Sequence, residues 1–136
     1  MLNCGISGNC VTNLLARWKK DCINLRPDVI SILIGVNDVW HEQSHQEGVD
    51  AEQFEETYRV LLRYTKRMLL ETKLILLGAY LTHGTATDGT QRDGFYKELA
   101  LRNSITHRLA AEFGEEFLDL QKIFNEACEM LSPEHW

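Results

Sequence analysis

Short apolar runs alternate along the chain with longer stretches in which apolar residues recur every three or four positions. Residues 29–34, VISILI, form the clearest run, which is rich in β-branched side chains. Such a run predicts a strand buried on both faces, as in a parallel sheet covered by helices. Residues 74–77, followed by Gly78, repeat the pattern, and residues 116–120 predict a third strand.

Helical spacing dominates the segments between these runs. A long amphipathic helix is predicted between the first two strands, with Asp50 as the N-cap of a capping box. Residues 95–113 predict another helix, ended by Gly114, and residues 11–24 and 121–131 predict two more. The apolar face of the long helix consists of Phe54, Tyr58, Leu61, Leu62, Thr65, Met68 and Leu69.

The order of these elements predicts a single domain over residues 1–136 with an α/β fold. We expect a three-layer α/β/α arrangement around a parallel sheet, with right-handed crossovers. In open parallel sheets, ligands bind beyond the carboxyl ends of the strands. The segments that should carry chemistry are therefore GVNDVW, residues 35–40, and GAYLTHGT, residues 78–85.

The two ends of the chain predict an incomplete domain. Met1 and Leu2 resemble the last part of a strand, residues 5–9 the loop after it, and the chain closes with SPEHW directly after a helix. Three strands with four helices would leave sheet edges and apolar helix faces uncovered. We therefore expect a fragment of a larger domain, which aggregates when isolated because apolar surface is exposed.

Composition narrows the classes of function. The 136 residues carry a formal net charge of -6 with scattered Lys and Arg, which argues against a nucleic acid or a membrane as partner. No apolar run approaches the roughly 18 residues that a membrane span needs. Four cysteines without a Cys-x-x-Cys pair are typical of reduced thiols, so the sequence predicts a cytoplasmic protein. No signal peptide is present, but this absence decides nothing for a fragment.

Two loops that follow strand positions, NCGISGN and GVND, contain candidate hydrogen-bond donors. Gly8 has no side chain to block a ligand from its backbone N–H, and Asn37 can add an amide N–H. Two donors that converge on one oxygen form an oxyanion hole. Glycine and asparagine are also ordinary turn formers after strands, and spacing alone does not separate the two interpretations.

The segment NCGISGNCVTNLLARWKKDCINLRPDVISILIGVNDVW resembles the region between the second and third conserved blocks of the SGNH (GDSL-type) hydrolases, especially the branch with acetylxylan esterases. The resemblance covers nearly the whole chain and implies a flavodoxin-like three-layer fold, with no cofactor and no metal. It implies that Gly8 and Asn37 are the oxyanion-hole donors. It also implies that Asp38 supports the turn and that Trp40 lies near the acyl or sugar site, and we place both with the substrate-binding residues.

Two parts of the family's pattern are absent from the sequence. The resemblance leads one to expect a Gly-Asp-Ser loop with the nucleophilic serine, and an Asp-x-x-His-Pro block with the base and the acid that orients it. The chain instead ends with Ser132, Pro133, Glu134 and His135, and Ser132 stands where the aspartate is needed. The resemblance therefore implies a chain that keeps the oxyanion hole, lacks a complete triad and is inactive alone.

The activity implied by the resemblance is hydrolysis of an ester through a serine nucleophile. Small O-acyl groups are the implied substrates, such as the acetyl groups of acetylated xylan or oligosaccharides, so a small-molecule or carbohydrate ester is the expected partner. A homo-oligomer is left open. The alternative is a non-catalytic protein of the same fold, either a binding protein for acylated sugar or the product of a decayed gene.

Residues 41–45, HEQSH, match the zinc-protease signature His-Glu-x-x-His. In such a site the two histidines bind Zn²⁺ and the glutamate activates the metal-bound water. Gly48 also falls where a longer version of the motif has glycine, but Ala51 stands at the third ligand position. Because the segment is polar throughout, we interpret residues 41–50 as an acidic loop before the next helix, and keep a zinc metalloprotease as a remote alternative.

Four further side chains near these segments have an ordinary structural interpretation. Ser7 does not lie in a Gly-x-Ser-x-Gly elbow, and we expect its hydroxyl to bond its own backbone. Cys4 and Cys10 are expected to be small buried hydrophobic residues and not reactive thiols. His83 either lines the cleft or is solvated.

Overall fold

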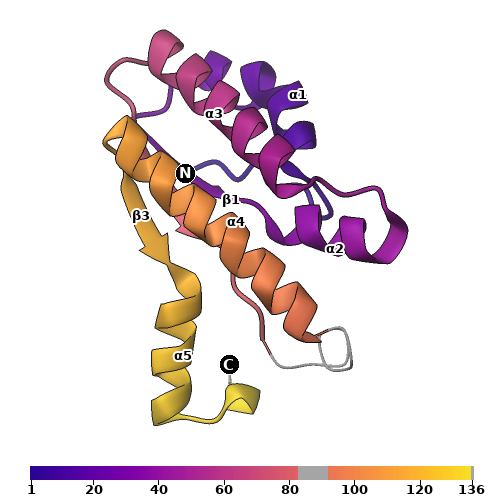
Figure 1. The fold of residues 1–136 in the computed structure, drawn as a ribbon. Coiled ribbons are helices and arrows are strands. Elements are labelled where there is room, and N and C mark those ends of the chain that lie inside the picture. Colours follow the sequence, from indigo (N-terminus) through magenta and orange to yellow (C-terminus); the bar gives the residue numbers. More distant parts are fainter. Residues whose placement is uncertain (83–91, 136) are drawn as a thin grey trace.

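The computed structural model describes residues 1–82 and 92–135. A sheet of three parallel strands lies at its centre, in the order β1 (Val29–Leu33), β2 (Lys73–Gly78) and β3 (Glu116–Asp119). Helices precede, connect and follow these strands (Figure 1). The predicted α/β fold with a parallel sheet is therefore confirmed.

Five α-helices and two short 3₁₀ helices accompany the sheet in the described part of the chain. The first predicted helix is divided at Cys22 into an α-helix and a short 3₁₀ turn. The last one begins at Leu120, one residue before its expected start, because the Asp119 side chain accepts the N–H of Lys122 at 3.0 Å and caps it. The elements are α1 (Val11–Asp21), η1 (Ile23–Leu25), α2 (Val36–His45), α3 (Ala51–Met68), α4 (Arg92–Phe113), α5 (Leu120–Met130) and η2 (Pro133–His135).

The segment after β1 is a helix, which corrects our interpretation of residues 41–45 as part of a loop, whereas residues 46–50 form a loop as predicted. Gly35, with a φ of +121°, turns the chain from the end of β1 directly into α2, which continues to His45. Only Asp38 and Val39 of this helix are buried, so its hydrophobic periodicity is too weak to predict it. Instead, the loop after the helix stabilises it. The N–H groups of residues 46 and 47 donate to the carbonyls of Glu42 and His41, and the N–H of Val49 donates to the carbonyl of Asp38 in the first turn.

One face of the sheet carries the main core. Ile30 and Ile32 of β1 are buried, whereas Val29 and Leu33 on the opposite face are exposed. The expected burial on both faces is therefore not observed, because α1, α3 and α4 all pack on the side of the sheet that carries Ile30. The fully buried helical side chains of this core are Val11, Phe54, Tyr58, Leu61, Leu62 and Leu109.

The long central helix, α3, follows its predicted pattern closely. Asp50 is its N-cap, and the carboxylate accepts the N–H of Gln53 at 2.9 Å, as the sequence predicts. Thr65 joins this helix to α1, because its hydroxyl oxygen accepts the indole N–H of Trp18 at 2.8 Å. Met68 is the exception, since it is 49% exposed.

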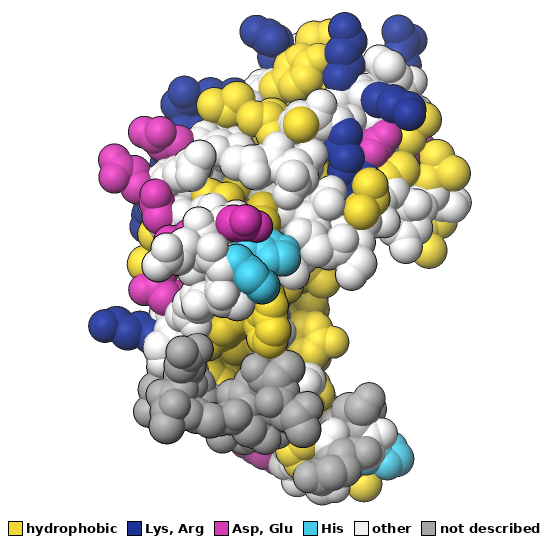
Figure 2. Space-filling model, turned by 90° about the vertical axis from the view of Figure 1, so that its right-hand side faces the viewer, with side chains coloured by type: hydrophobic (Ala, Val, Ile, Leu, Met, Phe, Trp, Pro, Cys, Tyr) yellow, Lys and Arg dark blue, Asp and Glu magenta, His cyan; other side chains and the backbone are white. Residues whose placement is uncertain are grey.

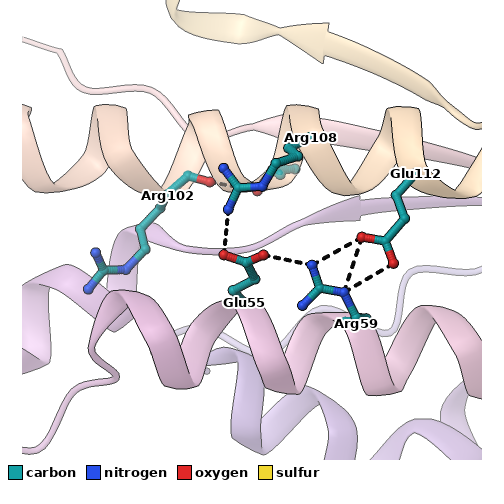
Figure 3. A network of polar contacts seen from close by, with 6 residues as sticks. Glu55, Arg59, Arg102, Arg108 and Glu112 are labelled. Carbon is teal, nitrogen blue, oxygen red and sulfur yellow. Dashed lines mark hydrogen bonds and ion pairs between the residues drawn. The ribbon is translucent and has the colours of Figure 1, made fainter.

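Charged side chains connect α3 and α4 at the surface (Figure 3). Arg59 Nε lies 3.1 Å from each carboxylate oxygen of Glu112 on α4. The same guanidinium also bonds Glu55, one turn earlier on α3, and Glu55 in turn pairs with Arg108 of α4. Four charges of alternating sign therefore hold the two helices side by side.

Apolar side chains also reach the surface. Met1 and Leu2 are fully or largely exposed and lie outside the sheet, so the expectation that they end a strand is wrong in this structure. Figure 2 shows hydrophobic side chains exposed among the charged ones on the face that it presents. No helix of the described residues is long and apolar enough to span a bilayer.

Candidate active site

Gly8 lies at the tip of a tight turn directly before α1. The carbonyl of Ile6 accepts the N–H of Asn9 at 3.3 Å, which closes a four-residue turn. Gly8, at its third position, has a φ of +82°, the value of a type II turn, which residues with a side chain rarely adopt. A glycine is therefore required here by the backbone, independently of any chemistry.

The backbone N–H of Gly8 is a free donor in the described structure. Gly8 is exposed, and its N–H takes part in none of the hydrogen bonds found among residues 1–82 and 92–135. An exposed, unpaired N–H in a fixed turn can donate to a ligand oxygen. This property is what the oxyanion-hole prediction requires of Gly8.

Asn37 reaches the same loop from the first turn of α2. Its side-chain Nδ2 donates to the backbone carbonyl of Asn9 at 3.1 Å. An amide nitrogen carries two hydrogens, so this contact orients the side chain and leaves a second N–H available. The structure thus brings together the two loops that carry Gly8 and Asn37, and their catalytic role stays a prediction.

Asp38, the next residue, is fully buried and supports the two loops from behind. Its Oδ1 accepts the N–H of Val11, the first residue of α1, at 2.9 Å. Burial raises the pKa of the Asp38 carboxyl to about 6, although the N–H of Val11 and the positive charge of Arg102 oppose the rise. The Asp38 side chain has no exposed surface in this structure and supports the turn, as the resemblance implies, and its assignment to the substrate-binding residues stays a prediction.

Arg17 of α1 holds the loop from the other side, and sequence reasoning missed it. Its Nη1 donates to the carbonyl of Cys4 at 2.7 Å, and its Nε donates to Asn9 Oδ1 at 3.0 Å. Asn9 is therefore held at two points. Arg17 bonds the side chain of Asn9, and Asn37 bonds the backbone carbonyl of Asn9. Asn9 lies in the turn before α1 and not in the helix, so no helical periodicity links it to Arg17.

His41 is a second residue that we did not assign to this site. Its Nε2 lies 3.0 Å from the backbone carbonyl oxygen of Gly8. His41 is four residues after Asn37 on α2, so both side chains project from the same face toward the loop. This spacing was a usable signal, but it could be recognised only once residues 36–45 were known to be helical.

A cavity of about 580 Å³ opens beside these loops at the carboxyl ends of the strands, a volume typical of a ligand pocket. Asn37 lines it, whereas Gly8 does not, although its neighbours Ile6 and Asn9 do. Trp40 does not line it either, because its ring packs edge-on against Phe95 of α4 with centroids 5.7 Å apart. The lining consists of Gly5, Ile6, Asn9, Leu14, Arg17 and residues 33–37 and 79–82.

The two histidines of HEQSH make hydrogen-bond contacts within the described part of the chain. No group of three or more His, Cys, Asp or Glu able to hold a metal ion exists among the described residues. His41 contacts Gly8 instead, and the exposed His45 lies beside Ser44, with its Nδ1 2.7 Å from the hydroxyl. Figure 2 shows histidine side chains at the surface of the molecule.

The thiol and hydroxyl groups near the loop differ in their exposure. Burial, with the negative charge of Asp38 as a second cause, raises the pKa of the Cys10 thiol to about 11, so the thiol is protonated at neutral pH. Cys10 is a small buried hydrophobic residue, as expected, whereas Cys4 is exposed. Ser7 is an exposed residue of the turn, and His83 lies outside the described residues.

Known proteins resemble the chain in sequence and in structure. An acetylxylan esterase of Geobacillus stearothermophilus is 33% identical over 133 residues, which cover 98% of this chain and 59% of that protein. The crystal structure of an acetylxylan esterase from the same organism, Axe2, superposes with a TM-score of 0.83 at 33% identity, over 98% of this chain and 60% of its own. A GDSL-like lipase of Parabacteroides merdae superposes with a TM-score of 0.87 at 35% identity, over 97% and 60% of the two chains.

The chain thus spans about three fifths of the length of these relatives. Residues 1–133, nearly the whole sequence, match the GDSL-like Lipase/Acylhydrolase family. This match agrees with the resemblance seen in NCGISGN and GVNDVW, two segments that the hydrogen bond from Asn37 to the carbonyl of Asn9 brings together. On sequence and on structure alike, the chain belongs to the GDSL-like lipase/acylhydrolase family.

Proposed function

We propose that the protein is a serine-type carboxylic ester hydrolase, to which residues 1–136 contribute the oxyanion hole. The observation that carries this proposal is the juxtaposition of the unpaired Gly8 N–H with the Asn37 amide, which is held 3.1 Å from the carbonyl of the neighbouring Asn9. Membership of the GDSL-like lipase/acylhydrolase family supports the same reaction class.

The proposed mechanism is acyl transfer through a tetrahedral intermediate. A serine hydroxyl, deprotonated by a histidine, attacks the ester carbonyl, and the carbonyl oxygen becomes negatively charged. The Gly8 N–H and the second N–H of Asn37 donate hydrogen bonds to this oxygen and so stabilise the transition state. The alcohol leaves with a proton from the histidine, and water then releases the acid from the acyl-serine.

The nucleophile and the base are assigned to parts of the protein outside residues 1–136. No Gly-Asp-Ser sequence occurs in these residues, and Ser132 stands where the acid of the Asp-x-x-His block is needed. The greater length of the relatives supports this assignment. On this proposal residues 1–136 do not hydrolyse esters by themselves.

For the substrate we propose a small O-acyl group, with acetyl groups of xylan or xylo-oligosaccharides as the first candidates. The names of the similar esterases support acetylxylan. The cavity of about 580 Å³ has room for a short acyl chain beside one sugar unit. Its lining by Ile6, Leu33 and Val36 favours an apolar acyl group next to Asn37.

Hydrolysis of an aryl acetate by the protein from the full reading frame tests the proposal, with Asn37→Ala as the key variant. Removal of one oxyanion-hole donor should lower kcat by about 10²- to 10³-fold. Asn24→Ala, at an exposed position of η1, is the matched control and should leave kcat unchanged. A thermal unfolding curve of each variant shows whether the fold is intact.

Two other results would overturn the proposal. If the protein from the full reading frame does not hydrolyse aryl or xylan acetates, the non-catalytic alternative holds. If it does, but Asn37→Ala and the control are equally active, the oxyanion is stabilised by other groups.

A further inference from the structure

α2 contacts the loop of the proposed oxyanion hole at two successive carbonyl groups. Asn37 Nδ2 donates to the carbonyl of Asn9 at 3.1 Å, and His41 Nε2 lies 3.0 Å from the carbonyl oxygen of Gly8. The two side chains come from consecutive turns of one helix. A rigid element therefore holds the peptide groups on both sides of Asn9.

The chemistry of the contact at Gly8 defines the state of His41. A carbonyl oxygen can only accept a hydrogen bond, so His41 Nε2 must carry a hydrogen. Both the neutral ring with its proton on Nε2 and the charged imidazolium meet this condition. His41 is thus a donor to the main chain, which leaves it unsuited to act as a general base through the same nitrogen.

The loop needs such a contact because its own backbone holds it weakly. Gly8 has no side chain, is exposed and has a φ of +82°, and the turn is closed by a single backbone hydrogen bond of 3.3 Å. Glycine samples more backbone conformations than any other residue. A bond to the Gly8 carbonyl restricts rotation about its ψ angle, and with it the orientation of the residue whose N–H is the proposed donor.

We propose that His41 is a positioning residue that holds the Gly8 N–H ready for the oxyanion. The inference rests on the proposed function, because it concerns the same oxyanion hole. His41 does not touch the reacting atoms; it acts through the carbonyl of Gly8. Its contribution is preorganisation, so it should affect kcat and leave KM nearly unchanged.

The test compares His41→Ala and His41→Gln in the protein from the full reading frame, with an aryl acetate as substrate. His41→Ala should lower kcat by about tenfold, less than the loss of a direct donor, with KM within about twofold. Glutamine places an amide nitrogen at a similar distance from the backbone and should restore most of the activity. His45→Ala, one turn further along α2, is the control and should behave like the unmodified protein.

The outcomes separate this inference from the proposed function. If Asn37→Ala lowers kcat strongly and His41→Ala does not, the oxyanion hole stands and the role of His41 is refuted. If Asn37→Ala has no effect, the proposed function itself fails. A loss of kcat in His41→Ala that glutamine does not restore, or that parallels a fall in melting temperature, overturns the positioning role in favour of a structural one.

Discussion

Gly48 lies against the backbone of α2 so closely that a Cβ atom there would be 2.2 Å from the carbonyl oxygen of Asp38. The same atom would lie 2.2 Å from the backbone nitrogen of Glu42. The loop after α2 thus folds back onto the helix, and the N–H of Val49 donates to that Asp38 carbonyl at 3.2 Å. Gly48, which matches the longer zinc motif, is required because the backbone of the loop packs directly against the backbone of α2.

Gly48→Ala should therefore be strongly destabilising. The clash is with backbone atoms, which cannot move aside as a flexible side chain can, so we expect a loss of about 2–4 kcal/mol in the free energy of unfolding. Urea unfolding of the protein from the full reading frame measures this value. A variant as stable as the unmodified protein would show that residues 46–49 do not pack on α2.

Asp38→Asn should change the pH dependence of stability. Burial raises the pKa of Asp38 from 3.8 to about 6, so between these pH values the folded protein holds a proton that the unfolded chain has lost. The free energy of unfolding should therefore fall by about 3 kcal/mol in total as pH rises through this window. Above the window it should no longer change. Asparagine keeps an acceptor for the Val11 N–H but does not ionise.

Urea unfolding of both proteins from about pH 4 to about pH 7 measures this effect. The unmodified protein should lose stability relative to Asp38→Asn as pH rises, with the change complete slightly above pH 6. Parallel stability curves for the two proteins would show that the carboxyl is not buried as described.

Gly8→Ala should lower both the stability of the protein and its activity. No atom lies within 4 Å of the added Cβ, so the cost comes from the positive φ alone, about 1–2 kcal/mol. Relaxation of that strain reorients the N–H, so kcat for an aryl acetate should fall by about tenfold or more. Gly94→Ala in α4, at a helical position without positive φ, is the matched control and should keep full activity. Equal activities in both variants would contradict the role of the Gly8 turn.

Arg59→Gln should weaken the connection between α3 and α4 in a salt-dependent manner. The guanidinium of Arg59 donates to both carboxylate oxygens of Glu112 and also to Glu55 (Figure 3). Because the network is close to the surface, we expect the melting temperature to fall by a few degrees at low ionic strength and by less in concentrated salt. Lys20→Gln, at an exposed position of α1, is the control. A loss that is the same at all salt concentrations would indicate packing and not charge.

Local sequence patterns predicted those parts of the fold that local forces determine. The apolar runs marked β1 and β2 to within one residue at each end, and the period of α3, with its Asp50 cap, predicted that helix. α2 was missed because contacts with the following loop stabilise it more than an apolar face does. Likewise, exposure of Val29 and Leu33 depends on which elements cover the sheet, which a single strand cannot reveal.

The residues of the candidate site were likewise predicted only in part. Gly8 and Asn37 were recognised through a family resemblance, since their spacing alone fitted ordinary turns. Arg17 and His41 could not be recognised, because each contacts main-chain atoms of a loop whose position only the folded structure reveals. The contact of Arg17 with the carbonyl of Cys4 leaves no periodic trace in the sequence, and the four-residue spacing of Asn37 and His41 is informative only once α2 is known to be a helix.

The bond between Asp38 and Val11 has a consequence for amide hydrogen exchange. The first N–H groups of a helix have no acceptor within it, so they normally exchange with deuterated solvent quickly. The Val11 N–H instead donates to a buried carboxylate from 27 residues away, and it exchanges only when α1 and α2 separate. The exchange rate of the Val11 amide therefore measures how often the contact between α1 and α2 opens, and this contact holds the two loops together.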